Sequence, residues 1–445
     1  MENAMYNTHN RQKERRLTVC AGWDNDMTIG TLFVTSSCKM SFEFDETWRQ
    51  QHSKIFLDPD LSCFKQGRQF LPSEKSCFGF LSDASPDRWG RTLIRRREAA
   101  IAKAESRKPK FFDDFEYLIA VDDATRIGGL RFKQENEPAF LSDSQSPVPT
   151  TASIRELEDA IRRYECSGEI QKNDRLLDLL APGSSLGGAR PKACVRDEHG
   201  ELWIAKFPSV NDAYDVGAWE YLLNRLAAEC GIDTPEAFLQ RIRGRSIFFS
   251  KRFDRQGNQR IHFASGMTIL GLVDNRCDAT GYYDIAQFIN ELSDTPERDV
   301  LELYKRIAFN IATSNTDDHL RNHGFLLDQD GTWRLSPAYD INPSPYSRGF
   351  LSLNVNENDP TATFETLLSS APLYGISEND TKHLIEEVEQ VVQSRWRHLA
   401  KDIGIPRNEV IMMKEAFSER FEPIVFYGFR NVEDISEFSD TTPTL

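Results

Sequence analysis

The sequence predicts an α+β protein in which a small sheet-containing lobe is followed by a helical lobe. Short runs of β-forming residues alternate with long amphipathic helical patterns, and the helical patterns dominate the second half of the chain. A composition of 39% hydrophobic and 28% charged residues is too apolar for a disordered chain. With 445 residues, the chain exceeds what one hydrophobic core usually supports, so at least two domains are expected.

The first clear helical pattern begins after Ser85, which is expected to cap it, with Pro86 at the first helical position. Its outer face is strongly basic. Residues 133–152 are rich in Pro, Ser and Thr and have no sustained apolar period, as is typical of a connection between packed units. This connection predicts an N-terminal domain over 1–145 and a second domain over 146–445.

Helical and strand patterns alternate in the second domain. A helix is expected from Ser153 to about Cys166, and Gly231 and Gly404 are placed to end two later helices. The other long helical pattern covers residues 299–315. The β-type runs are ELWIAKF (201–207), RSIFFSKRF (245–253), HGFLL (323–327) and TWRLSP (332–337).

Net charge and cysteine spacing exclude some classes of protein. A net charge of −15 argues against a protein whose whole surface follows nucleic acid. The eight cysteines form no C-x-x-C pair, so reduced thiols are expected. No apolar run is long enough for a signal peptide or a membrane span, which predicts a cytoplasmic protein without membrane contact.

A glycine-rich segment, Gly183 to Lys192, contains two serines and ends in the cations Arg190 and Lys192. Glycines let backbone N–H groups approach an anion, and the cations would neutralise phosphate charge. The segment is not a Walker A loop, and a plain flexible loop would also explain its composition. Lys206 follows at the end of a β-type run, where a strand would hold a phosphate-binding lysine rigidly.

The strongest chemical pattern begins at Asp317. Asp317 and Asn322 have the D-x-x-x-x-N spacing of a kinase catalytic loop, and Asp340 follows an expected hairpin. One carboxylate would deprotonate the attacking hydroxyl, while an amide oxygen and a second carboxylate would hold Mg²⁺. Each of Asp317, Asp318 and Asn322 taken alone is better explained as a turn or cap residue. Their order along the chain favours phosphoryl transfer.

A metal-dependent hydrolase is the competing interpretation. His319 and His323 are four residues apart, so on a helix they would share a face and bind a metal with Asp317 or Asp318. The segment lacks the glutamate of an H-E-x-x-H motif, and its Asn and Gly residues favour a loop.

Successive blocks of the chain resemble the HipA family, the serine/threonine kinase toxins of type II toxin–antitoxin modules. The blocks are FGFLSDASPDRWGRTLIRRR (78–97), YLIAVDDATRIGGLRF (117–132), SSLGGARPKA, WIAKFPS, KRFDR, NTDDHLRNHGF and LSPAYDINP. The resemblance implies an atypical protein-kinase-like core, with a nucleotide-binding lobe to about residue 260 and a helical catalytic lobe after it. A smaller N-terminal α/β domain would precede this core.

The resemblance also implies ATP- and Mg²⁺-dependent phosphorylation of a protein, with Asp317 as the catalytic aspartate and Asn322 and Asp340 as Mg²⁺ ligands. Ser185 matches the serine at which family members autophosphorylate. Asp318 stands where the family usually has glycine. The residues expected to contact the nucleotide are Gly187, Gly188, Ala189, Arg190, Pro191, Lys192, Lys206, Lys251, Arg252, Phe253, His319, Leu320, Arg321, Asn322, Tyr339 and Asp340.

The partners that the resemblance implies are a protein substrate, in known members an aminoacyl-tRNA synthetase, and a small helix-turn-helix antitoxin. DNA would be reached only through that antitoxin. A regulatory pseudokinase that binds nucleotide and acts with such a partner is the alternative that the same residues leave open.

Overall fold

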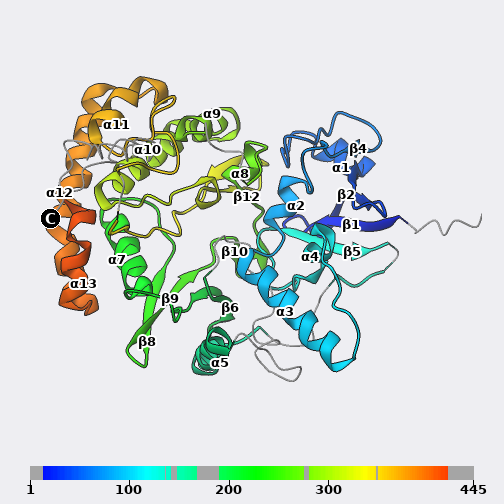
Figure 1. Cartoon of the computed structure of the whole chain (residues 1–445). Coiled ribbons are helices and arrows are strands. Elements are labelled where there is room, and N and C mark those ends of the chain that lie inside the picture. Colours follow the sequence, from blue (N-terminus) through cyan, green and yellow to red (C-terminus); the bar gives the residue numbers. More distant parts are fainter. Residues whose placement is uncertain are drawn as a thin grey trace, which may run out of the picture.

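The structure is a computed structural model, and it describes residues 14–135, 137–141, 148–167, 190–274, 280–346 and 349–418. Figure 1 shows the N-terminal region on the right, the helical lobe at the upper left, and a small sheet below the helical lobe. Helices and sheets are mixed throughout, which confirms the expected α+β class. Within the described residues, no helix is long and apolar enough to cross a membrane.

The N-terminal region is built on a five-stranded antiparallel sheet with the order β4-β3-β2-β1-β5. One face of the sheet is apolar and packs on short helices around the buried residues Phe42, Trp48 and Phe80. The elements are β1 (Arg15–Ala21), β2 (Met27–Val34), β3 (Met40–Phe44), α1 (Glu46–Gln51), β4 (Gln69–Phe70), α2 (Gly79–Asp83), α3 (Arg88–Ala104), α4 (Asp114–Ala120) and β5 (Leu130–Gln134).

The cap of helix α3 differs from the sequence prediction. The side chain of Asp87, and not that of Ser85, accepts the hydrogen bond from the backbone N–H of Gly90 at 2.7 Å. The hydroxyl of Ser85 instead donates to the carbonyl of Leu81 in the preceding helix α2, at 2.8 Å. Because α2 ends directly before α3, Ser85 serves the end of one helix and Asp87 the start of the next.

The sheet below the helical lobe has four antiparallel strands with the order β6-β7-β9-β8. Helix α7 covers one face, and Trp89 and Leu93 of α3 pack with α5 against the other face. The bounds are η1 (Thr151–Ser153), α5 (Ile154–Ser167), β6 (Lys192–Arg196), β7 (Leu202–Lys206), α7 (Val216–Glu229), β8 (Ala237–Ile242) and β9 (Arg245–Lys251).

The helical lobe packs on a large core in which α10 contacts both α9 and α12. Gly231 (φ 74°) and Gly404 (φ 76°) end helices α7 and α12 in the left-handed conformation, as the sequence predicts. The remaining elements are β10 (Arg255–Gln256), β11 (Gln259–Arg260), β12 (Phe263–Ser265), α8 (Gly266–Ile269), α9 (Tyr282–Leu292), α10 (Pro296–Thr313), η2 (Leu320–Asn322), β13 (Gly324–Leu327), β14 (Trp333–Leu335), α11 (Phe364–Ser370), η3 (Ala371–Tyr374), α12 (Glu378–Ile403), α13 (Arg407–Met412) and η4 (Met413–Phe417).

A buried cluster of charges joins the N-terminal region to the end of strand β9. The guanidinium of Arg252 donates to the carbonyls of Thr125 and Arg126, at 2.7 and 2.8 Å, and to both carboxylate oxygens of Asp254. Asp254 also accepts from the backbone N–H of Gly128 at 2.7 Å. Arg252 and Asp254 are almost fully buried. Their hydrogen bonds therefore hold residues 125–128 of the N-terminal region firmly against the end of strand β9.

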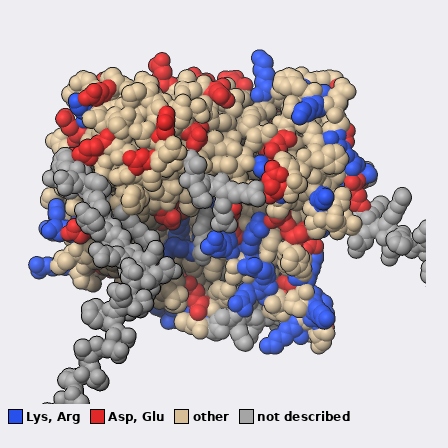
Figure 2. All heavy atoms as spheres, turned by 45° about the horizontal axis from the view of Figure 1, so that its top comes forward, with Lys and Arg blue, Asp and Glu red and all other residues tan. Residues whose placement is uncertain are grey.

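The basic outer face predicted for α3 is present. Arg95, Arg96 and Arg97 are exposed, and Figure 2 shows Lys and Arg side chains gathered along the lower edge of one face of the molecule. The net charge of −15 is therefore unevenly distributed over the surface.

Candidate active site

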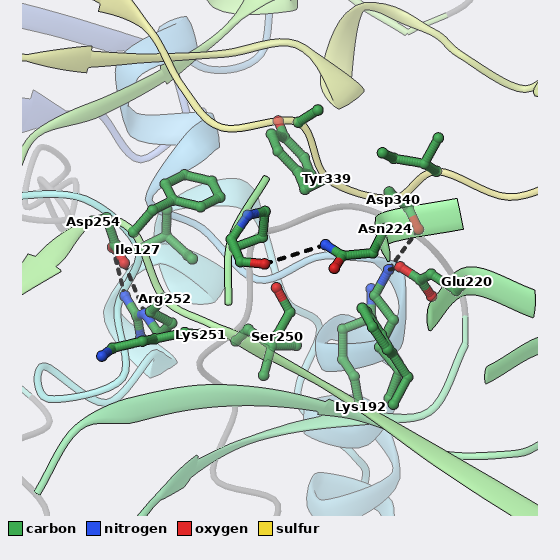
Figure 3. A pocket seen from close by; sticks show the side chains of 17 residues that line it. Ile127, Lys192, Glu220, Asn224, Ser250, Lys251, Arg252, Asp254, Tyr339 and Asp340 are labelled. Atoms are coloured by element: carbon green, nitrogen blue, oxygen red, sulfur yellow. Dashed lines mark hydrogen bonds and ion pairs between the residues drawn. The ribbon is translucent and has the colours of Figure 1, made fainter. Parts of the chain in front are cut away.

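A pocket opens between the four-stranded sheet and the segment after β14, and encloses about 640 Å³ including its mouth. Figure 3 shows Lys192, Glu220 and Asp340 on one side of this pocket and Arg252 and Asp254 on the other. The lining residues are Ile127, Lys192, Ile204, Lys206, Glu220, Asn224, Pro235, Phe248, Ser250, Lys251, Arg252, Phe253, Asp254, Ala338, Tyr339, Asp340 and Ile341. A concave site with apolar walls and a few convergent charges is typical of a small-molecule site.

The charged side of the pocket is centred on Lys206, the last residue of β7. Its ammonium lies 2.5 Å from Glu220 Oε1 and 2.6 Å from Asp340 Oδ1. Glu220 comes from helix α7, and Asp340 from the segment after β14, so three elements meet at this lysine. Burial alone would lower the pKa of Lys206, but the carboxylates of Asp340 and Glu220 raise it well above its usual value. Lys206 therefore carries a fixed positive charge in the pocket.

Asp340 has an unusual backbone. Its φ of 58° lies in the left-handed region, which few residues other than glycine adopt. Burial would raise the pKa of its carboxyl, but the Lys206 ammonium outweighs burial and holds the pKa below its usual value. The site thus keeps Asp340 ionised at the cost of backbone strain, a combination common in functional sites.

The catalytic-loop pattern lies directly after helix α10, which ends at Ser314 in a left-handed conformation. Asp317 is exposed, while Asn322 is buried and donates from Nδ2 to the Asp317 carbonyl at 3.2 Å. Partial burial raises the pKa of Asp317, an effect that His319 opposes and Asp340 reinforces. A raised pKa brings a carboxylate closer to the range in which it accepts protons near neutral pH.

Asp318 has a different role from Asp317. Its buried carboxylate accepts hydrogen bonds from Tyr282 Oη at 2.8 Å and Asn310 Nδ2 at 2.7 Å, and shares one with His323 Nε2 at 2.9 Å. Asp318 therefore ties the loop that carries Asp317 and Asn322 to helices α9 and α10 and to His323.

Most of the other predicted nucleotide contacts already have partners in the protein. Arg190 forms a bidentate pair with Asp212, and Lys251 pairs with Glu201. Arg321 pairs with Asp274 at 3.0 Å, and its carbonyl accepts from Tyr339 Oη at 2.7 Å. Phe253 stacks at a tilt on Tyr339, with ring centroids 5.6 Å apart, and both rings line the pocket. His319 is half-buried and Leu320 is buried, and neither lines the pocket.

The glycine-rich loop predicted to hold phosphate falls largely outside the described residues. Gly187, Gly188, Ala189 and the predicted phosphorylation site Ser185 are in this group, as is Ser184. Pro191 and Lys192, which follow, are described. The Pro191 carbonyl accepts from the backbone N–H of Phe207, so this end of the loop is anchored to β7.

The side-chain oxygen atoms of Asn322 and Asp340 are suitable ligands for Mg²⁺. Because Asn322 uses its amide nitrogen on the Asp317 carbonyl, its Oδ1 is left without a hydrogen bond to any described residue. Asp340 Oδ2 likewise has no hydrogen bond to a described residue, while Oδ1 accepts a hydrogen bond from the Lys206 ammonium. One amide oxygen and one carboxylate oxygen are the ligands that this hard cation prefers. Tyr339 lines both the main pocket and a small neighbouring cavity that reaches Asn322.

The arrangement required by the metal-dependent hydrolase is not formed. Residues 320–322 make a 3-10 turn, so His319 and His323 do not share an α-helical face. His323 Nε2 is engaged by Asp318. The described part of the chain contains no group of three or more His, Cys, Asp or Glu side chains placed to hold a metal ion.

Reasoning from sequence missed two carboxylates of the site, Glu220 and Asp87. Glu220 lies among the apolar residues of α7, and an acid on the buried face of an amphipathic helix was the available signal. Asp87 lies 3.0 Å from the Lys192 ammonium across 105 positions of sequence, a contact that no local pattern encodes.

Comparison with known proteins supports the family resemblance. Residues 184–396 match the family model of the HipA-like C-terminal domain. This part of the chain is a HipA-like domain. The resemblance to the HipA family seen in the sequence is thereby confirmed.

Relatives and solved structures agree with this assignment. The protein named "Putative kinase Y4mE" of Sinorhizobium fredii is 25% identical over 347 residues, which are 72% of this chain and 76% of that protein. A protein of Haemophilus influenzae named "Putative kinase" is 27% identical over 192 residues, which are 38% of this chain and 56% of that protein. The HipA of Shewanella oneidensis, solved with HipB and operator DNA, aligns with a TM-score of 0.63 at 18% identity, covering 90% of this chain and 95% of that one. The HipA-like kinase fold, with its preceding N-terminal region, is thus present.

Proposed function

We propose that the protein is an ATP- and Mg²⁺-dependent serine/threonine protein kinase of the HipA type. The single observation that best supports this function is the meeting of Lys206, Glu220 and Asp340 in the pocket beside the Asp317–Asn322 loop. A charged lysine tied to a helix carboxylate and to a metal-binding aspartate is the arrangement that phosphoryl transfer from a nucleotide requires.

In this proposal each residue has one task. The Asp317 carboxylate accepts the proton of the attacking serine or threonine hydroxyl as that oxygen bonds to the γ-phosphorus and the bond to the β–γ bridging oxygen breaks, releasing ADP. Lys206 neutralises phosphate charge, and the apolar wall that includes Ile204 and Phe253 holds the base. Asn322 and Asp340 would hold Mg²⁺, which offsets the charge that develops on the phosphate oxygens.

The domain division belongs to the same proposal: an N-terminal domain over 1–145, a nucleotide-binding lobe to about 260 and a catalytic lobe after it. Lys192, Lys251 and Arg252 would flank the nucleotide on the sheet side. Ser185, in the glycine-rich loop, would be the autophosphorylation site. A phosphate there would compete with ATP for nearby cations and switch the kinase off.

The proposed partners follow from the family. The substrate would be a protein of the translation machinery, with an aminoacyl-tRNA synthetase as the first to test. A small helix-turn-helix antitoxin would bind the chain, as HipB accompanies HipA in the Shewanella complex, and would bring operator DNA to it.

The test is to incubate the purified chain with labelled ATP and Mg²⁺ and to map any phosphosite by mass spectrometry. ATP binding is measured in parallel by calorimetry. We expect the parent to bind ATP and label itself at Ser185, and Asp317→Asn to bind ATP while transfer falls by several orders of magnitude. A parent that binds ATP but transfers nothing to itself or to a synthetase would support the nucleotide-binding pseudokinase instead. Equal transfer by Asp317→Asn would remove Asp317 from the chemistry.

A further inference from the structure

The first turn of helix α3 reaches the pocket from the N-terminal region. The ammonium of Lys192 lies 3.0 Å from Asp87 Oδ2, and both side chains are nearly inaccessible to solvent, at 3% and 2% exposure. The indole nitrogen of Trp89 donates to the carbonyl of the same lysine at 3.1 Å. The N-cap residue of α3 and a residue of its first turn therefore hold both the side chain and the backbone of Lys192.

Lys192 lies directly beside the central lysine of the pocket. It is the register partner of Lys206 in the β6–β7 pairing, and both residues line the pocket. Two like charges opposite one another on adjacent strands repel, so this arrangement needs a separate carboxylate for each lysine. Glu220 and Asp340 serve Lys206, and Asp87 serves Lys192.

A buried ion pair contributes little net stability, because the cost of removing both charges from water offsets their attraction. Stability alone would be served as well by two apolar side chains at these positions. The pair does place a second cation at the side of the pocket where Lys206 marks the expected phosphate position. We propose that Asp87 is a positioning residue of the nucleotide site, which holds the Lys192 ammonium in place, so that the N-terminal region takes part in ATP binding. This inference rests on the proposed kinase function.

Asp87 also caps α3, with Oδ1 accepting from the Gly90 N–H while Oδ2 faces Lys192. Substitutions separate these two roles. Asn and Ser cap helices about as well as Asp, but neither carries a charge. Glu keeps the charge and caps poorly. If capping were the only role, Asp87→Ser would behave like the parent and Asp87→Glu would be impaired.

The experiment measures ATP affinity by calorimetry, and KM and kcat for phosphate transfer, on the full chain. We expect Asp87→Asn and Asp87→Ser to raise the Kd and KM for ATP about tenfold or more, given two unit charges this close and this buried. We expect kcat to change much less and Asp87→Glu to stay closer to the parent. Lys192→Met should match Asp87→Asn, and the double variant should be no worse than either single variant.

Asp113→Asn is the matched control. Asp113 caps α4 by accepting from the Glu116 N–H at 2.8 Å and pairs with Arg15 at 2.7 Å, but it does not line the pocket. Its substitution should leave ATP affinity unchanged.

Parental ATP affinity in Asp87→Asn, or impairment in Asp87→Glu but not in Asp87→Ser, would overturn the inference while leaving the kinase proposal intact. Tighter ATP binding in Asp87→Asn would also overturn it, since Asp87 would then compete with phosphate. A parent that binds no ATP would overturn both proposals.

Discussion

The ammonium of Lys206 lies 2.6 Å from the carboxylate of Asp340, although 134 residues separate the two in the sequence. This contact joins the four-stranded sheet to the segment that follows β14. Both groups line the pocket, so under the proposed function nucleotide phosphates would meet a pair of charges already fixed by the fold.

Lys206→Met should destabilise the fold as well as abolish ATP binding. The substitution leaves the buried Glu220 carboxylate and the partly buried Asp340 carboxylate without their cation, and breaking a buried pair in this way typically costs about 3–5 kcal/mol. Denaturant unfolding measures this loss. Lys382→Met, which removes an exposed lysine from a 2.6 Å pair with Glu378, is the control and should leave the free energy of unfolding nearly unchanged. Equal losses in the two variants would contradict the buried network.

Asp340→Asn should remove the Mg²⁺ dependence of ATP binding. Asparagine tolerates the left-handed φ of 58°, so this variant changes the charge and spares the backbone. Asp340→Ala should behave alike toward Mg²⁺ and lose about a further 1–2 kcal/mol of stability to backbone strain. Calorimetric ATP titrations with and without Mg²⁺ provide the measurement. An Asp340→Asn protein whose ATP affinity still rises with Mg²⁺ would exclude this carboxylate as a ligand.

Asp318→Asn should lower phosphate-transfer activity because it loosens the loop that carries Asp317 and Asn322, and not because Asp318 takes part in the reaction. All three hydrogen bonds converge on Oδ2 of Asp318, and a neutral amide oxygen is a weaker acceptor than a carboxylate oxygen, so the substitution weakens each of them. We expect a stability loss of about 2–3 kcal/mol and a lower kcat. Tyr282→Phe removes one of these bonds and should cost only about 1 kcal/mol. If Asp318→Asn unfolds at the parental denaturant concentration, the carboxylate does not hold the loop.

His262 predicts a specific loss of stability in mild acid. Its ring is fully buried, stacks on Trp23 and has no hydrogen-bond partner among the described residues, and burial lowers its pKa to about 3. The unfolded chain takes up this proton near pH 6.5, whereas the folded chain does not. Folding stability therefore falls as the pH drops below about 6.5, by about 1.4 kcal/mol between pH 7.5 and 5.5 from this residue.

His262→Phe keeps the stacking and removes the titration, so its stability should vary less over that interval. Denaturant unfolding at the two pH values measures the difference. His383→Gln, at an exposed position, serves as the control and should keep the parental pH response. If His262→Phe loses as much stability as the parent, the buried ring is not the cause.

The sequence predicted the elements whose signals are local. Strands β7 and β9 and helices α7, α10 and α12 lie where apolar period and glycine placement indicate. The spacing of Asp317 and Asn322 and the place of Asp340 also follow from short motifs. The contacts of Asp87 and Arg252 could not be predicted, because Lys192 lies 105 positions after Asp87 and Thr125 lies 127 positions before Arg252, and only packing brings these residues together.

Arg252 has a mechanical consequence for the whole chain. Its guanidinium donates to the carbonyls of Thr125 and Arg126 and so links the N-terminal region to the end of strand β9. Both of these residues are buried, so water cannot replace the guanidinium as their hydrogen-bond partner. A hinge at this point would have to break several buried hydrogen bonds at once. The N-terminal region and the four-stranded sheet should therefore move as one rigid body. Any closing motion over a bound nucleotide then has to come from the helical lobe.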